Sequence, residues 1–488
     1  MTAFEKFPAS ELLSGTDHNK SRGGDLARSL GPATLVMLII AAVAPLACTI
    51  GTVPLLYAFG SGAAAPFSFV VSTVVLLLFA VGYAQMSRRV SSGGALYRYV
   101  ARGLGPSSGL GAAFIAVLAY IVFNIGNLAY TGYYGTVLLH DLFHLDVSWI
   151  SNVAILGLLI GALGFRQLDV SARVIVVLLI FEFGLLLLFD GAILAHHGLD
   201  AFTVRIFDPG LIASGSPSIG LMFAFLCYLG FESAAIYSDE VRSPKRSIPI
   251  ALYSAVTVLG IFYIATTWLT IGLVGTNQIR SLAAADPPAL YLILNTRLVG
   301  QLGTKVMELF MVTSVFASTL AIHNAATRYV FNLGRQGCFP ALLGRAHQRY
   351  GSPHCASIAT SLVTVLPCIA FGLAGVAPIV GVGSITTALG TIGILILQAM
   401  SAVAIIVYFI RCREVHWWRT LTAPLLAAMA LMLIVYAGFQ DFGLLSGTSA
   451  TRVGLLPWSM LVALAVGFCY ARWAKKHKPG LHAELARP

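Results

Sequence analysis

The sequence has 488 residues, of which 58% are hydrophobic and only 10% are charged, and its formal net charge is +11. Soluble domains carry roughly 25% charged residues, so this chain has too little polar surface to coat a water-soluble fold of its length. The composition excludes a disordered chain, a secreted disulfide scaffold and a soluble enzyme, and it favours an all-α polytopic membrane protein, because each membrane span needs roughly 20 mostly apolar residues.

Twelve apolar segments follow one another, separated by short loops rich in Gly, Pro, Ser and Arg. They lie at 32–57, 66–87, 108–139, 147–164, 172–195, 216–238, 249–275, 302–332, 354–375, 383–410, 417–439 and 454–473. We therefore predict twelve transmembrane helices. The predicted organisation is a cytoplasmic tail at 1–30, a ten-helix core at 31–411, two peripheral helices at 412–473 and a second cytoplasmic tail at 474–488.

The basic residues predict how these spans are oriented. With the N-terminus placed in the cytoplasm, 25 of the 30 Lys and Arg residues fall on the cytoplasmic side. The five outside are Arg205, Arg280, Arg297, Lys305 and Arg452. Cytoplasmic loops of membrane proteins carry such an excess of cations, so we expect a multi-pass protein of the cell membrane with both termini in the cytoplasm. The net charge then reflects orientation in the lipid bilayer, and no nucleic acid is expected as a partner.

Two spans contain helix breakers near their middle. Span 1 carries Pro45, Gly51 and Pro54 inside a single apolar segment, and span 6 carries Gly230 directly before Phe231 and Glu232. A proline inside a helix removes one backbone hydrogen bond and clashes with the preceding turn. Since unpaired backbone at membrane depth is tolerated only where it is buried in protein or lines a cavity, we predict that helices 1 and 6 are discontinuous and border a site.

The two breaks lie five spans apart, which predicts two repeats of five spans, at about 31–196 and 212–411. Because five is odd, the second repeat must be inverted in the membrane. Breaks at matching positions of inverted repeats are typical of the midplane substrate site of a secondary transporter. Half-helix N-termini there can bind a carboxylate, and the freed carbonyl groups can accept from an ammonium group, so a zwitterionic amino acid is the predicted cargo.

At these residues the sequence resembles the amino acid–polyamine–organocation (APC) superfamily of permeases. Span 6 and its following loop read GFESAAIYSDEVRSPKRSIPIAL at 230–252, which is similar to a signature of that family. The segments at 79–105 and 328–356 also resemble its cytoplasmic segments. The resemblance implies the 5+5 inverted repeat shared with leucine transporters (the LeuT-like fold), spans 11 and 12 at the periphery, and transport of amino acids or related amines by alternating access.

The resemblance also implies which residues bind the substrate. It places them on the span 1 break, on span 3 and on the span 6 break. They are Pro45, Ala47, Cys48, Thr49, Gly51, Asn127, Cys227, Tyr228, Gly230 and Phe231. Phe231 or Tyr228 is expected to stack over the cargo as a gate, with ordinary packing as the alternative. For Asn127, hydrogen bonding between helices explains an asparagine in an apolar span equally well.

Glu182 is a carboxylate about 13 Å into the membrane core, counted at 1.5 Å per residue from Arg173. An ionisable residue at that depth is a functional hypothesis by default. Its position resembles the one where several proton-coupled family members carry a lysine between spans 1 and 8. We therefore predict that Glu182 is the proton-coupling site, with Ser318 and Thr319 as its partners or, alternatively, as ligands of a sodium ion.

Two further acidic residues lie inside or close to the spans. Glu232 follows the span 6 break directly, and we expect it to accept from freed N–H groups and to latch conformations, with substrate contact as the second role. Asp190 lies nearer the outer end of span 5, about 80° around the helix from Glu182 at 100° per residue. We expect Asp190 at the membrane interface.

The predicted function is a proton-coupled amino acid importer rather than an enzyme, with a polyamine or amine carrier, or an exchanger, as the alternative. A nutrient sensor without turnover is less favoured, because neither tail is longer than about thirty residues. No zinc-type Cys/His spacing and no phosphate-binding glycine motif occurs in the chain, so no metal and no cofactor other than the coupling ion is expected. The sequence leaves monomer and homodimer open.

Overall fold

The computed structural model describes residues 31–90, 95–166, 172–235, 241, 243–348, 351–445 and 453–477. Within these ranges the regular structure is helical throughout, with no β-strand. Eleven helices are long and apolar enough to cross a membrane, and the segment expected at 147–164 forms a shorter apolar helix at Trp149–Phe165. The polytopic all-α class is therefore confirmed. Both predicted tails lie almost wholly outside the described residues, as do 236–240 and 242 of the span 6 motif.

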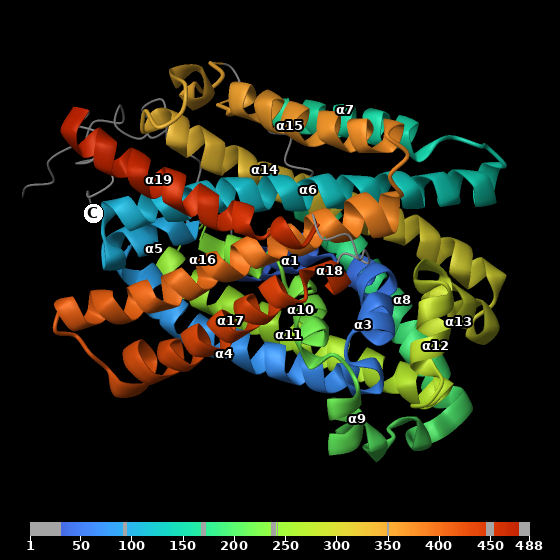
Figure 1. The fold of residues 1–488 in the computed structure, drawn as a ribbon. Helices are drawn as coiled ribbons and strands as arrows, with labels where there is room; N and C mark the ends of the chain where they lie inside the picture. Colours follow the sequence, from blue (N-terminus) through green and yellow to red (C-terminus); the bar gives the residue numbers. More distant parts are fainter. Residues whose placement is uncertain are drawn as a thin grey trace, which may run out of the picture.

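Most of the long helices run in similar directions along one bundle (Figure 1). Their bounds agree with the apolar segments to within a few residues, except at the two broken spans. The long helices are α4 (Ala65–Arg89), α6 (Pro106–Phe143), α7 (Trp149–Arg166), α8 (Ala172–His197), α11 (Pro244–Val274), α14 (Gln301–Arg335), α15 (His354–Leu373), α16 (Ser384–Arg411), α17 (Ala423–Gln440) and α19 (Trp458–His477). The shorter ones are α5 (Ala95–Leu104), α9 (Pro209–Ser214), α12 (Ile279–Ala285), α13 (Leu290–Leu298) and α18 (Phe442–Leu445).

Span 1 is interrupted at Ala44. The helix α1 (Pro32–Val43) ends there, a three-residue turn α2 (Pro45–Ala47) and a π-helical turn η1 (Cys48–Thr52) follow, and α3 (Val53–Phe59) completes the span. Ala44 adopts a left-handed conformation with φ 56°. The ring of Pro45 disfavours the α conformation at the residue before it, which accounts for the position of the break. An alanine in this conformation costs about 1–2 kcal/mol, so the surrounding contacts must hold it there.

Span 6 is interrupted one helix turn after α10 (Pro217–Leu226), and a short 3₁₀ turn, η5 (Phe231–Ala235), follows. Gly230 has φ +115°, a conformation that glycine adopts without steric cost. A Cβ atom at Gly230 would lie 3.3 Å from the backbone carbon of Ala42, so the second break packs directly against the last turn of α1 before the first break. The two predicted interruptions are therefore present, and they meet in the interior.

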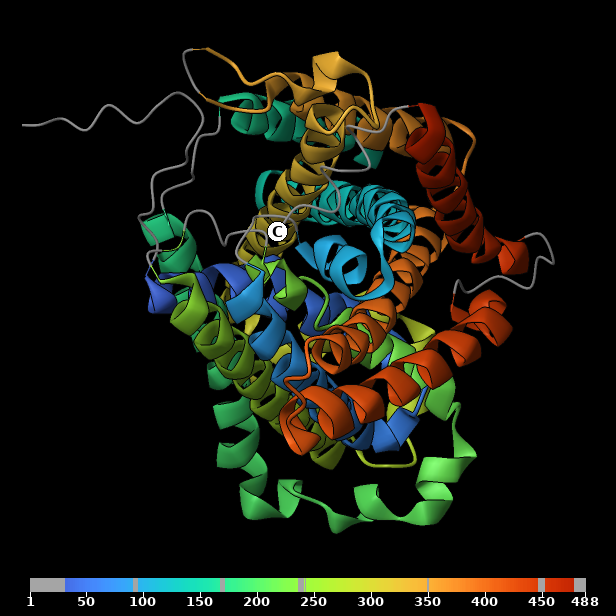
Figure 2. The ribbon, with the colours of Figure 1, turned by 90° about the vertical axis from the view of Figure 1, so that its left-hand side faces the viewer.

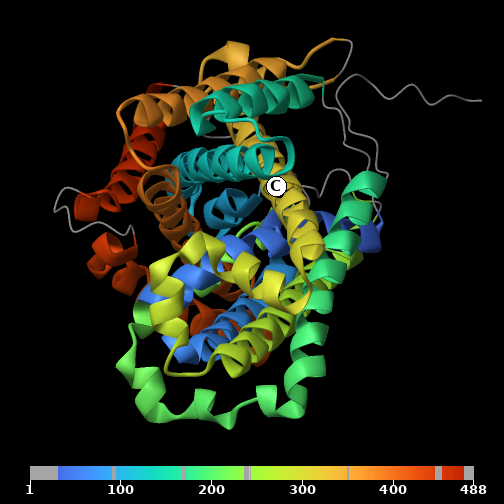
Figure 3. The same ribbon diagram turned by 90° about the vertical axis from the view of Figure 1, so that its right-hand side faces the viewer.

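The remaining helices surround this pair. The helix α6 runs the length of the bundle and contacts α14, α16 and α19, while α11 packs along α4. Viewed from the end, α7 and α15 lie together on one side of the bundle (Figure 2). On the opposite side, residues 198–214 form an arm that connects α8 to α10 (Figure 3). Helix α17 packs on α4 and α16, and α19 packs on α6, so both form the outer rim.

Cationic residues gather at one end of the bundle. The C-terminal ends of α4, α14, α16 and α19 carry Arg88, Arg89, Arg335, Arg411, Lys475 and Lys476 in their last turns. The ends of α4, α16 and α19 lie at the left of Figure 1, together with α5. This grouping is what the alternating loops of the sequence predict.

A glycine on α5 allows close packing against α16. A Cβ at Gly103 would lie 2.1 Å from the backbone oxygen of Ala404, a distance that no relaxation of side chains can relieve. We expect Gly103→Ala to lower the free energy of unfolding by about 1–3 kcal/mol, the usual cost of overpacking. The measurement is the Tm of the purified protein in detergent. Gly184→Ala is the control, because nothing lies within 4 Å of a Cβ there. Equal Tm changes in both variants would contradict the packing argument.

Candidate substrate site and coupling site

A small cavity of about 40 Å³ lies where the two breaks meet. Pockets that hold small molecules usually measure about 300–1,000 Å³, so the helices are closed around this one. Its walls come from the span 1 break and from α6, α10, α14 and α16. The lining residues are Val43, Ala44, Ala47, Cys48, Gly51, Thr52, Phe123, Asn127, Tyr130, Tyr134, Leu226, Leu229, Met311, Val315, Ser318 and Thr387.

Of the span 1 residues predicted to bind substrate, Ala47, Cys48 and Gly51 line this cavity. Pro45 and Thr49 do not line it. They pair with each other, since the Thr49 hydroxyl donates to the Pro45 carbonyl oxygen at 2.8 Å. Only one face of the turn from Ala44 to Thr52 therefore lines the cavity.

Asn127 lines the cavity, and it also forms the hydrogen bond between helices that the alternative interpretation describes. Its Nδ2 donates to the hydroxyl oxygen of Ser318 on α14 at 3.1 Å. The Ser318 hydroxyl in turn donates to the carbonyl oxygen of Ala42 at 2.8 Å. This chain connects α6, α14 and the end of α1, and it satisfies a carbonyl group exposed by the break.

The residues predicted on span 6 are not in the cavity wall: Cys227, Tyr228, Gly230 and Phe231 all lie outside it. The Tyr228 hydroxyl bonds to that of Thr73 on α4 at 2.6 Å. The Phe231 ring packs edge-on against Phe79, with 6.1 Å between ring centroids. Span 6 contributes Leu226 and Leu229 to the cavity wall in place of these four residues. In this conformation neither aromatic ring lines the cavity, and both contact α4 instead.

Sequence reasoning missed the aromatic wall on α6. Phe123, Tyr130 and Tyr134 line the cavity with Asn127, and the four are spaced four, three and four residues apart. That spacing places residues on one helix face, so extending the face of Asn127 along the span would have found them. The hydroxyl of Tyr134 is buried and has no hydrogen-bond partner within the described chain. It lies 3.7 Å from the position of a Cβ atom on Gly51.

We predict that the Tyr134 hydroxyl bonds to the bound cargo. Tyr134→Phe should raise the KM for uptake roughly 2- to 10-fold, the value of one hydrogen bond, without lowering the Tm. Tyr57→Phe is the control, because that hydroxyl bonds to Tyr291 at 3.1 Å and lies away from the cavity. It should lower the Tm and leave the KM unchanged. A Tyr134→Phe variant with normal KM would show that its hydroxyl plays no part in binding.

Glu182 joins three elements at the first break. Its side chain is only 4% exposed on α8, and its Oε2 accepts from the hydroxyl of Ser314 on α14 at 2.7 Å. The backbone N–H of Leu46, in the turn after the break, also donates to this carboxylate. Glu182 therefore lies between spans 1 and 8, at the expected location. No basic side chain of the described chain forms an ion pair with Glu182.

The predicted partners of Glu182 are wrong by one helix turn. Ser314 takes the place expected of Ser318, which bonds instead to Ala42 and Asn127. The hydroxyl of Thr319 donates to the Val315 carbonyl oxygen at 2.7 Å and contacts Thr131 on α6. Counting along a span cannot fix which turn of α14 faces α8, because the relative height of two helices is set by their packing.

Comparison with known proteins identifies the family. A family model described as "Amino acid permease" matches residues 30–469, which is nearly the whole chain. The chain belongs to the amino acid permease family. The resemblance to APC permeases that was read from the span 6 motif is confirmed.

Three relatives of this permease are of known type. The methylthioribose transporter of Bacillus subtilis is 24% identical over 96% of this chain and 98% of its own. The branched-chain amino acid permease BcaP of the same species is 21% identical with the same two coverages. The low-affinity putrescine importer PlaP of Escherichia coli is 24% identical over 62% of this chain and 66% of its own. All three are transporters, and they differ in cargo.

In the permease, Glu232 has the contact expected of it at the second break. Its Oε2 accepts from the N–H of Gly230 at 3.1 Å. Its Oε1 accepts from the hydroxyl of Tyr120 on α6 at 2.7 Å, and its backbone oxygen accepts from the hydroxyl of Tyr83 on α4 at 2.8 Å. Glu232 thus ties the break to two helices, although it does not line the cavity.

Asp190, which was expected at the membrane interface, is buried against α11. Its side chain is only 6% exposed, and the hydroxyl of Thr266 on α11 donates to its Oδ2 at 2.7 Å. The angle around α8 placed this residue correctly apart from Glu182. The angle alone could not show that α11 packs over the face of α8 that carries Asp190.

Proposed function

We propose that this permease is a secondary active transporter that imports an amino acid by alternating access. The observation that carries the proposal is the closed cavity at the junction of two interrupted helices, in a chain of the amino acid permease family. Interrupted helices offer backbone groups to a substrate at membrane depth, where a continuous helix offers none. A cavity of this size requires the surrounding helices to separate before cargo enters, as alternating access demands.

We infer that a proton is the coupling ion and that Glu182 carries it. This carboxylate bonds to the turn after the span 1 break and to α14, so its charge state acts on the same turn that forms the cavity wall. Protonation from outside would favour closure around the cargo, and release inward would follow opening. Sodium is the alternative ion, with the hydroxyl groups of Ser318 and Thr319 as ligands.

The cavity wall favours a neutral amino acid. The described residues that line it include no charged side chain, and much of the wall is apolar, formed by Phe123, Leu226, Leu229, Met311 and Val315. A polyamine would need carboxylates in this wall, because a buried cation without a partner is costly. An amine carrier is therefore the second candidate, supported by the putrescine importer among the relatives.

The membrane arrangement is part of the proposal. Twelve spans in a 5+5 inverted repeat, with both termini in the cytoplasm, agree with eleven long helices, one shorter apolar helix and cations gathered at one end of the bundle. The cationic end would face the cytoplasm.

The first experiment is uptake of a panel of labelled amino acids and amines into proteoliposomes, with and without an imposed pH gradient. We expect accumulation of a neutral amino acid that depends on the gradient. Uptake that requires sodium and ignores pH would overturn the proton assignment. Preferential uptake of amines would favour the second candidate, and binding without uptake would overturn transport itself.

A further inference from the structure

A second polar pocket, of about 390 Å³, lies at the cationic end of the bundle, away from the substrate cavity. Three segments form it: the end of α4, the start of α11 and the connection between α16 and α17. Its lining residues are Gln85, Arg88, Arg89, Lys245, Phe409, Glu414, His416, Arg419 and Thr420. The transport function assigns no task to this pocket.

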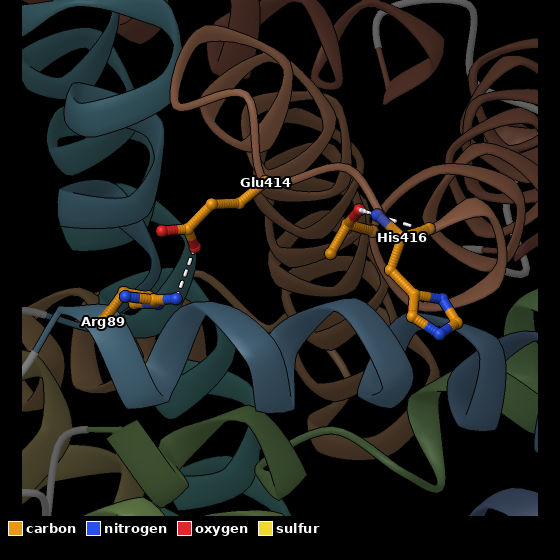
Figure 4. Close-up of polar contacts among 4 residues, drawn as sticks. Arg89, Glu414 and His416 are labelled. Carbon is orange, nitrogen blue, oxygen red and sulfur yellow. Dashed lines mark hydrogen bonds and ion pairs between the residues drawn. The ribbon is translucent and has the colours of Figure 1, made fainter.

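The charge in the pocket is uncompensated among the described residues. Arg89 forms an ion pair with Glu414, the only carboxylate in the pocket lining (Figure 4). Arg88, Lys245 and Arg419 form no ion pair with any residue that the structure describes. Arg88 comes from α4 and Arg419 from the connection to α17, and both residues line this pocket. Of the four cations in the pocket lining, three therefore have no ion-pair partner among the described residues.

The connection to α17 carries Arg419, and hydrogen bonds of His416 fix the conformation of this segment. The Nδ1 of His416 accepts from the backbone N–H groups of Trp418 and Arg419, each at 3.3 Å. The backbone N–H of His416 donates to the Thr420 hydroxyl at 2.8 Å. Because Nδ1 is an acceptor, the hydrogen of a neutral His416 ring is on Nε2, which is then a donor. The turn η9 (Trp417–Thr422) is therefore fixed at its start.

The surroundings are those of a membrane surface. Trp417 and Trp418 are 69% and 37% exposed beside the pocket, and tryptophan is enriched at the level of lipid headgroups. Leu425, Leu426 and Met429 are exposed in the first turns of α17. Counted from Arg419 at 1.5 Å per residue, they lie about 9–15 Å further along the helix. A molecule with a phosphate at one end and acyl chains at the other fits this order of cationic, aromatic and apolar surface.

We propose that this pocket binds the phosphate headgroup of an anionic phospholipid, between the core helices α4 and α11 and the peripheral helix α17. Basic pockets between membrane helices are suited to such headgroups, and arginine forms directed hydrogen bonds to phosphate oxygens. The bound headgroup joins the peripheral helix to the core. The proposal does not depend on the cargo or on the coupling ion.

The test is lipid binding to the purified full-length protein in detergent, followed by native mass spectrometry. Phosphatidylglycerol is titrated as the anionic lipid and phosphatidylcholine as the zwitterionic one. The pocket variant is Arg88→Gln, Lys245→Gln and Arg419→Gln together. We expect it to bind phosphatidylglycerol at least about tenfold more weakly, because each cation near a lipid headgroup contributes to binding.

The matched control removes the same charge at the end of α19, through Arg472→Gln, Lys475→Gln and Lys476→Gln. It should bind phosphatidylglycerol like the unaltered protein. Equal loss in both variants, or equal binding of both lipids, would overturn the site. Inorganic phosphate is added as a competitor, and full displacement of the lipid at millimolar phosphate would assign the pocket to the free ion instead. Arg419→Gln alone is measured as well, so that a poorly folded triple variant cannot decide the outcome.

Discussion

Replacing Glu182 by glutamine is expected to abolish accumulation of cargo driven by a pH gradient. The amide has nearly the shape of the carboxylate and keeps one oxygen that accepts a hydrogen bond from α14 or from the span 1 turn, whereas the side chain no longer exchanges a proton. Exchange of labelled for unlabelled cargo across the membrane should continue, because that half-reaction needs no net proton movement. The two assays together separate loss of coupling from loss of folding.

The matched variant is Ser314→Ala. It removes the 2.7 Å hydrogen bond to Glu182 but keeps the carboxylate. Gradient-driven accumulation should persist in this variant, with a changed dependence on external pH, because one donor to the carboxylate has been lost. If Glu182→Gln accumulates cargo as the unaltered protein does, Glu182 is not the coupling site. If both variants lose exchange as well as accumulation, the cluster is structural.

Enlarging Gly51 is expected to close the substrate cavity. A Cβ there would lie 3.5 Å from Met311 and 3.7 Å from the Tyr134 hydroxyl, which are ordinary contact distances. Gly51→Ala should therefore fold and transport. In Gly51→Leu the additional atoms point into a cavity of about 40 Å³, and uptake should fall to background. The measurement is uptake into proteoliposomes across the series Gly, Ala and Leu at this position.

The control for this series is Gly191→Leu on α8, where nothing lies within 4 Å of a Cβ atom. It adds the same side chain to the protein away from the cavity and should leave uptake unchanged. Full uptake by Gly51→Leu, with a Tm equal to that of the unaltered protein, would mean that cargo does not pass through this cavity.

Much of the fold could be predicted because the membrane makes local sequence decisive. Apolar length predicted the spans, since every backbone polar group in lipid must be satisfied within a helix. Pro45 placed the first break within one residue, because a proline restricts the residue before it whatever packs nearby. Gly230 placed the second break in the same way, since few other residues adopt its φ angle.

The site was predicted less well. Of the residues predicted to bind substrate, Ala47, Cys48, Gly51 and Asn127 line the cavity, whereas the whole set from span 6 does not. Tyr134 was missed although it lies on the face of Asn127. The direction that a chain takes after a break, and therefore which side chains it presents, depends on the helices packed against it.

The sequence by itself determined the class of the protein, its spans, the two interruptions and the two buried glutamates, because each follows from the local cost of placing polar groups in lipid. Only the tertiary structure decided which groups meet. It assigned Ser314 to Glu182, Tyr120 to Glu232 and Thr266 to Asp190. It also brought Arg88, Lys245 and Arg419 to one pocket from segments far apart in the chain. Such contacts depend on the relative height and rotation of packed helices, and that choice belongs to the assembled bundle.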